Sequence, residues 1–108
     1  MTSRRGEVWE YGLPDAGKFR VVVVSNDVQN EMPGAWPLCA LVTRRAPAAG
    51  EIPAFTIVLA DPDPLGGVVL TTTVRALDPS GMVVQLGIVT GATLVRINAA
   101  LRDLFDLD

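Results

Sequence analysis

Four cationic side chains fall in two short groups along the chain, in or beside segments that we expect to be loops. They are Lys18, Arg20, Arg44 and Arg45, four of the nine cations in the sequence. The chain as a whole is acidic, with a net charge of −3, but phosphate contacts depend on local charge. The two groups therefore indicate a local phosphate-binding surface. The alternative is that they are ordinary solvated charges of surface loops.

The chemistry open to this chain is limited by the residue types that it lacks. It has no histidine and a single cysteine, Cys39. Histidine catalysis, ordinary zinc sites and internal disulfides are therefore excluded, and we expect neither a metal nor a cofactor. We expect no secretory leader, and the sequence has no apolar run near the ~18 residues of a membrane helix. We expect a cytoplasmic protein with no membrane contact.

The cationic residues must be positioned by a small β-rich body. The 108 residues fit one domain, which we expect to span residues 1–108. Short β-branched segments alternate with glycine and proline turns, a pattern typical of β-hairpins. Four consecutive valines in Arg20–Ser25 predict a strand buried on both faces. The expected strands are Glu7–Tyr11, Arg20–Ser25, Leu38–Thr43, Ala54–Leu59, Gly67–Ala76 and Met82–Val89.

The last segment, Thr90–Leu104, has the periodicity of a helix. Its apolar residues are spaced by three, four and three positions, which predicts one apolar face. These residues are Leu94, Ile97, Leu101 and Leu104. Thr90 is a suitable N-cap, and Arg96, Asn98 and Arg102 are expected to face away from the apolar stripe. The predicted architecture is a small, strongly curved antiparallel barrel with a C-terminal helix.

Several segments resemble, in order and spacing, those of the MazF/PemK toxin family of bacterial toxin–antitoxin systems. Arg5-Gly6-Glu7-Val8-Trp9 is similar to its opening strand, and Val22-Val23-Val24-Ser25-Asn26-Asp27 to its second strand and turn. Ala40-Leu41-Val42-Thr43 and Gly67–Asp78 resemble its third and fifth strands. The resemblance covers essentially the whole chain. It implies the CcdB/MazF-like fold, a small SH3-like antiparallel β-barrel, mainly β with a C-terminal α-helix.

The resemblance also implies an activity and partners. Members of the family cleave single-stranded RNA at short sequences without a metal. The ribose 2′-oxygen attacks the adjacent phosphorus, which leaves a 2′,3′-cyclic phosphate and a 5′-hydroxyl end. The implied assembly is a homodimer, and the implied protein partner is a MazE-like antitoxin whose flexible acidic tail competes with RNA.

The resemblance assigns roles to particular residues. Thr43 falls on the family's strand-end threonine and would hydrogen-bond the scissile phosphate. Arg20 is the expected catalytic cation, with Lys18 as the alternative. The residues expected to contact RNA are Lys18, Arg44, Arg45, Thr72, Thr73 and Arg75.

Two positions depart from the family pattern. The family has Arg-Pro before the valine-rich strand, where this chain has Phe19-Arg20. A one-residue shift directs a side chain to the opposite face of a regular strand, unless a bulge restores it. Thr72 and Thr73 replace an acidic residue and a glutamine. Loss of one comparable contact typically costs about 10²–10³ in rate, which predicts a slow enzyme or a different base preference.

Other readings of the sequence remain open. The threonines at 71–73 are also good strand formers and need have no role in RNA binding. The same fold could serve as a gyrase-binding inhibitor of the CcdB type, because fold alone does not fix function. A catalytically impaired member that still binds RNA or antitoxin is a further alternative.

Overall fold

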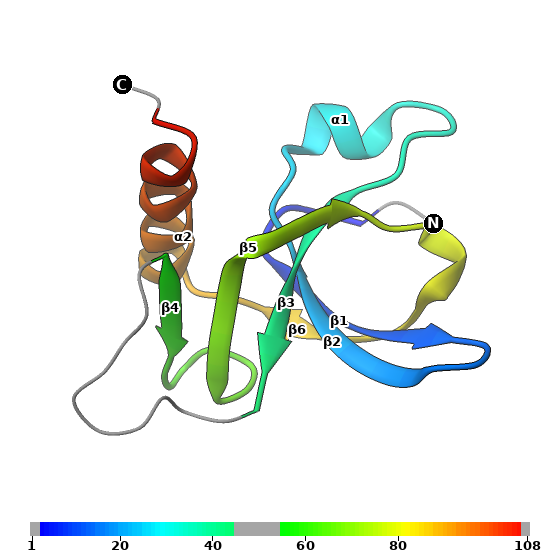
Figure 1. Cartoon of the computed structure of the whole chain (residues 1–108), viewed down its shortest axis with the longest axis horizontal. Helices are drawn as coiled ribbons and strands as arrows, with labels where there is room; N and C mark the ends of the chain where they lie inside the picture. The colour runs from blue at the N-terminus through cyan, green and yellow to red at the C-terminus, as the bar shows by residue number, and fades with distance from the viewer. Residues whose placement is uncertain (1–2, 45–54, 107–108) are drawn as a thin grey trace.

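The computed structural model describes residues 3–44 and 55–106, which form six strands and two α-helices (Figure 1). The strands are β1 (Glu7–Leu13), β2 (Gly17–Val23), β3 (Leu38–Thr43), β4 (Thr56–Leu59), β5 (Gly67–Ala76) and β6 (Met82–Ile88). The helices are α1 (Asp27–Glu31) and α2 (Gly91–Leu104), and a 3-10 turn, η1 (Pro79–Gly81), precedes β6. All six predicted strands are found. Ala54, the expected start of β4, lies outside the described residues.

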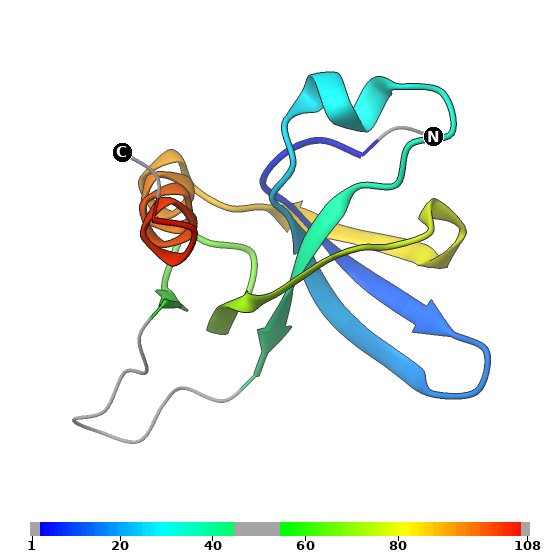
Figure 2. The same ribbon diagram turned by 45° about the horizontal axis from the view of Figure 1, so that its top comes forward.

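The strands form one antiparallel sheet in the order β4-β5-β3-β2-β1-β6. The sheet is strongly curved, and β5 bends sharply along its length (Figure 1). Within the described chain, β4 and β6 remain edge strands, so the sheet does not close into a complete barrel. Figures 1 and 2 show α2 at one end of the molecule and the β1–β2 hairpin at the other. The expected mainly-β fold with a C-terminal helix is confirmed.

The valine run of β2 is buried on both faces, as its composition predicts. Val22, and Val24 just after the end of β2, belong to a core cluster that includes Ile97 of α2. Val21 and Val23 belong to a second cluster, with Trp9 and other residues, on the opposite face. Because neighbouring side chains of a strand point to opposite faces, one strand supplies both clusters. The face with the first cluster is called the α2 face below.

The β1–β2 hairpin is tighter than the sequence suggests. β1 continues past its predicted end at Tyr11, β2 begins before its predicted start at Arg20, and their pairing runs without a shift from Val8↔Val22 to Leu13↔Gly17. Gly17 has a φ of +79°, a conformation that glycine adopts without the steric cost of a side chain. The regular register fixes which face each residue of β2 occupies.

Both helices begin at a capping side chain, and the cap of α2 at Thr90 is the predicted one. The Asn26 side chain accepts a hydrogen bond from Gln29 N at 2.8 Å, and the Thr90 side chain accepts one from Thr93 N at 3.1 Å. Ile97, a residue of α2, is fully buried. Neither helix, within the described residues, has the length and apolar character to cross a membrane.

One expectation for α2 was wrong in part. Arg96 and Arg102 are exposed as predicted, but Asn98 is half-buried and accepts a hydrogen bond from the Arg5 guanidinium. This contact joins residues at opposite ends of the chain. Helical periodicity therefore could not reveal it.

Candidate functional site

Arg20, in the middle of β2, and Arg44, just after β3, line one shallow depression of about 580 Å³. Its other lining residues, Leu59, Leu65, Gly66 and Gly67, come from β4 and the loop that leads into β5. Arg44 is exposed and Arg20 is half-buried. This surface is called the Arg20 depression below. Two guanidinium groups that share one opening suit an anionic ligand such as a phosphodiester.

The wall of this depression depends on a close backbone approach. A Cβ at Gly67, whose φ is +129°, would lie 1.9 Å from the carbonyl oxygen of Thr43. Thr43 is the last residue of β3 and pairs with Val68 of β5. Only glycine permits this approach, so Gly67 fixes the position of Thr43 and of the chain entering Arg44.

The register of β2 settles the orientation of Arg20. Arg20 pairs with Glu10 of β1 and Val42 of β3, and Val42 belongs to the core cluster of the α2 face. No bulge interrupts β2, so Phe19 points to the opposite face, which is the face where the family pattern places arginine. Thr43 alternates with Val42 along β3. Arg20 and Thr43 therefore flank the same strand end from opposite faces of the sheet.

A second hollow lies on the Phe19 face. It measures about 490 Å³ and is called the Phe19 groove below. Its lining residues include Leu13, Phe19, Leu41, Thr73, Arg75 and Leu77. One side of Phe19 packs against Tyr11, with ring centroids 5.3 Å apart and an interplanar angle of 38°. The groove is mainly apolar, with one cation at its rim.

The three threonines of β5 lie in three different environments. Thr71 is fully buried, and its hydroxyl donates to the carbonyl oxygen of Phe55. Thr72 is exposed. The Thr73 hydroxyl donates to the Leu70 carbonyl at 2.6 Å and accepts from the Leu41 amide at 2.8 Å. Only Thr72 presents an exposed side chain to a ligand.

The Thr73 contacts close an irregularity in the sheet. Between the pairs Cys39↔Arg75 and Leu41↔Leu70, β3 advances two residues while β5 advances five. The extra residues leave backbone groups without a regular ladder partner, and the Thr73 hydroxyl satisfies two of them. Sequence reasoning assigned Thr73 to RNA binding and did not detect this structural role, because the irregularity is visible only once β3 and β5 are paired.

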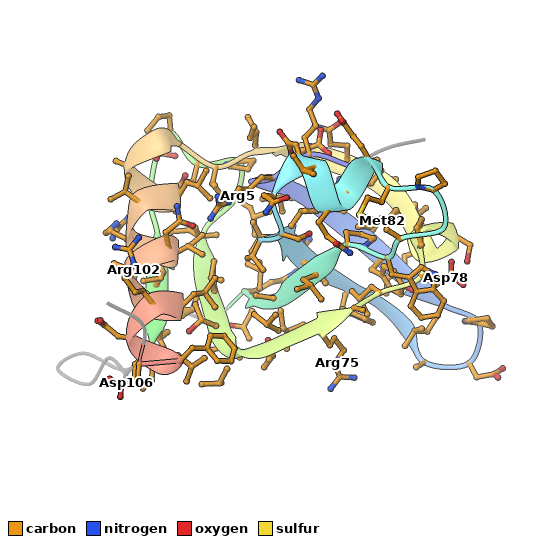
Figure 3. The ribbon with its side chains drawn as sticks, turned by 90° about the horizontal axis from the view of Figure 1, so that it is seen from above. Arg5, Arg75, Asp78, Met82, Arg102 and Asp106 are labelled. Atoms are coloured by element: carbon orange, nitrogen blue, oxygen red, sulfur yellow. The ribbon has the colours of Figure 1, made fainter. Side chains whose placement is uncertain are left out.

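The remaining predicted cations are spread over both faces. Lys18 is exposed and shares the face of Arg20 by strand alternation. Arg75 is exposed and extends from β5 away from the body of the protein (Figure 3). Arg45 lies outside the described residues.

One carboxylate near the Arg20 depression was missed by the sequence analysis. Glu10 is half-buried and lies directly across from Arg20 on β1. The available signal was its position two residues after the buried Val8 in a regular strand, which places both on the α2 face. Carboxylates are common general bases, so Glu10 is a candidate base across from Arg20.

Cys39 takes no part in such chemistry. The side chain is 1% exposed, and burial raises the pKa of its thiol to about 12. The thiol is therefore protonated at neutral pH and unreactive. Among the described residues, no three histidine, cysteine, aspartate or glutamate side chains are grouped so as to hold a metal ion.

Comparison with known proteins agrees with this geometry. The model of a family described as PemK-like, MazF-like toxin of type II toxin–antitoxin systems matches residues 4–105. The chain belongs to this family. As a PemK/MazF toxin-family member it is related to endoribonucleases, although no curated protein matches its sequence.

Solved structures support the assignment over nearly the full length. An endoribonuclease from a mycobacterial species, in complex with its cognate antitoxin, is 25% identical with a TM-score of 0.85, covering 98% of this chain and 97% of that one. A second mycobacterial endoribonuclease is 25% identical with a TM-score of 0.85, covering 99% and 94%. MazF from Deinococcus radiodurans is 25% identical with a TM-score of 0.78, covering 99% of each chain.

Proposed function

We propose that this PemK/MazF-family chain is the toxin of a type II toxin–antitoxin system and cleaves single-stranded RNA. The proposed reaction is attack of a ribose 2′-oxygen on the adjacent phosphorus, which expels the 5′-oxygen and leaves a 2′,3′-cyclic phosphate. The observation that carries the proposal is the pairing of Arg20 and Arg44 in one depression beside the end of β3. The mycobacterial relatives named as endoribonucleases support RNA cleavage as the activity.

The proposed mechanism uses four side chains at the scissile phosphate and a fifth at a flanking phosphate. Arg20 and Arg44 stabilise the charge of the phosphorane, because cations aimed at developing charge lower the barrier. Thr43, at the end of β3, hydrogen-bonds a phosphate oxygen from the opposite face of the sheet. Glu10, across from Arg20, accepts the proton of the 2′-hydroxyl. Lys18 lies farther along the same face and contacts a flanking phosphate.

The test is incubation of the purified protein with a long single-stranded RNA in EDTA. We expect fragments with 2′,3′-cyclic phosphate ends and 5′-hydroxyl ends, identified by end-specific ligation or phosphorylation. Intact RNA at micromolar protein would contradict the proposal. Equal cleavage of an RNA whose 2′-hydroxyls are replaced by hydrogen would exclude the 2′-oxygen as the nucleophile.

We further propose a homodimer formed through β6. This strand has an unpaired edge in the described chain and carries no charged residue. Val83, Val84, Leu86 and Ile88 are all exposed on it. Natural edge strands are usually protected by charges or by a cover, so an uncharged apolar edge favours pairing with a second copy.

We propose that the protein partner is an antitoxin of the MazE kind whose flexible acidic tail competes with RNA for the cations of the Arg20 depression. The neighbours include an endoribonuclease solved in complex with its cognate antitoxin. The action on cellular RNA fits the expected cytoplasmic location. An acidic tail peptide should then inhibit cleavage competitively, and its inhibition should weaken as salt rises.

One observation favours the alternative of a catalytically impaired family member. The hydroxyl of Thr73, which stands at the family's glutamine position, is engaged by two backbone groups, so it does not replace the glutamine contact. Under this reading the protein binds RNA but leaves it intact. Gel-shift and cleavage measurements on the same RNA separate the two functions.

A further inference from the structure

The Phe19 groove combines an aromatic floor, aliphatic walls and one exposed arginine. Phe19 packs against Tyr11 on one side, and the groove lies beside it. Leu13, Leu41 and Leu77 supply the aliphatic walls, and Arg75 stands at the rim. Sites that bind single-stranded nucleic acid combine a stacking aromatic with a nearby cation in this way.

The polar groups of the groove narrow the choice of ligand. The Thr73 hydroxyl donates its proton to Leu70 and accepts from Leu41, so it has no proton to donate to a ligand. The Cys39 thiol lies 3.9 Å from the Pro37 carbonyl and is buried. The Arg75 guanidinium is thus the main polar feature, and it offers only donors.

We propose that the Phe19 groove is a nucleobase subsite that prefers guanine, with Phe19 as the stacking platform and Arg75 as the reader. An arginine fork pairs in a bidentate manner with two neighbouring acceptors, and the N7 and O6 atoms of guanine provide them. Adenine presents a donor in place of O6, which opposes the guanidinium. The hollow of about 490 Å³ has room for a purine ring.

The position of the groove relates it to the proposed reaction, on which this inference rests. Leu41 of the groove lies two residues before Thr43 on β3, and strand alternation places both on one face. A base held over Phe19 would therefore belong to a nucleotide near the phosphate at Thr43. Cleavage should depend on a guanine at one fixed position relative to the cut.

The test is cleavage of a pool of single-stranded RNAs with a random central region, in EDTA, followed by sequencing of the new ends. The native protein should enrich guanine about tenfold at one position. Arg75→Lys keeps the charge but loses the fork, so the enrichment should fall to near unity while cleavage of the pool continues. Arg102→Lys, an exposed position on α2, is the control and should leave the enrichment unchanged.

Phe19→Leu is the second variant, with its melting temperature measured to confirm that it folds. It should weaken RNA binding and reduce the guanine enrichment together, because it removes the stacking platform. Absence of guanine enrichment in the native protein, or enrichment that survives Arg75→Lys, would overturn the subsite.

A binding measurement separates this inference from the nuclease proposal. Guanosine 5′-monophosphate should shift the methyl resonances of Leu13 and Leu77, adenosine 5′-monophosphate should do so less, and Arg75→Lys should abolish the difference. If these shifts occur while no RNA is cleaved, the nuclease proposal fails and the subsite stands. If RNA is cleaved but neither nucleotide shifts the methyl groups, the subsite fails and the nuclease stands.

Discussion

At the scale of single residues, the orientation of Arg20 has the largest consequence for function. The sequence places an arginine one position later than the family pattern, and the regular β2 register turns it to the α2 face. There it shares a depression with Arg44 and faces Glu10 across the strand pair. Arg20 therefore lies beside the same strand end but on the α2 face. Phe19 occupies the face where the family pattern places arginine.

Replacement of Arg20 tests this assignment. Arg20→Ala should reduce the rate of RNA cleavage by about 10²–10³-fold, the usual effect of losing one group that stabilises transition-state charge. The measurement is single-turnover cleavage at saturating protein, with Arg102→Ala on α2 as the matched control. Cleavage at the native rate would transfer the role to Lys18 or Arg44.

The buried carboxylate of Asp63 offers a second residue-scale test. Burial opposes its ionisation, but hydrogen bonds from Thr90 N at 2.8 Å, Thr93 Oγ1 at 2.8 Å and Ala60 N at 3.2 Å outweigh it and lower its pKa. A carboxyl with a lowered folded-state pKa stabilises the protein above its ordinary value of about 4. That stabilisation is lost as the pH falls through the folded-state pKa.

Asp63→Asn should therefore lower the free energy of unfolding at pH 7 by about 1–3 kcal/mol, since a charged acceptor of three hydrogen bonds is removed. The loss should shrink as the pH falls from about 4 through the lowered folded-state pKa, below which the native carboxyl is protonated too. Urea unfolding at several pH values measures both. Asp61→Asn, two residues earlier and exposed, is the control and should change little.

At the scale of elements, the close approach of β5 to the end of β3 positions Thr43 and the Arg20 depression. A methyl group at residue 67 would collide with the Thr43 carbonyl. Gly67→Ala should lower stability by about 2–4 kcal/mol, through strain at a positive φ and displacement of the strand end. Thermal unfolding and RNA cleavage should both show the loss.

Gly66→Ala is the matched control for this prediction. A Cβ at Gly66 meets no atom within 4 Å, and the residue borders the same depression. We expect its stability to change by less than about 0.5 kcal/mol. Equal losses in the two variants would mean that general loop rigidity, and not the contact with Thr43, is responsible.

Elements were more predictable than the positions of individual side chains. β3 and β5 have the predicted bounds at both ends, because apolar β-branched runs bounded by glycine and proline are local signals. The cap at Thr90 was predictable for the same reason. The role of Thr73 was not, because it depends on which residues of β3 and β5 lie opposite one another. The contact between Arg5 and Asn98 likewise joins distant parts of the chain.

The candidate site was likewise predictable in its residue types but not in the orientation of its side chains. Residue types predicted a cationic surface beside the end of β3, and Arg20 and Arg44 do line one depression there. Which face Arg20 occupies required the strand register, since a bulge would have reversed it. Glu10 was missed because a single carboxylate in a strand is ordinary until its cross-strand neighbour is known.

At the scale of the whole molecule, the apolar edge of β6 predicts self-association. Ile88 is 57% exposed on this edge, and Ile88→Lys would place a charge where a second copy is expected. We expect the dimer dissociation constant to rise at least tenfold, measured by sedimentation equilibrium. Val95→Lys, at a 66% exposed position on α2, is the control. A native protein that stays monomeric at millimolar concentration would refute the β6 dimer.

The hydroxyl of Thr73 limits how this toxin could be re-engineered. Grafting the acidic–glutamine pair of its relatives onto residues 72 and 73 would release the Leu41 amide and the Leu70 carbonyl, which that hydroxyl now satisfies. A longer amide side chain would have to serve those groups or reach the substrate, and it could not do both. Recovery of those base contacts would therefore require a compensating change in β3.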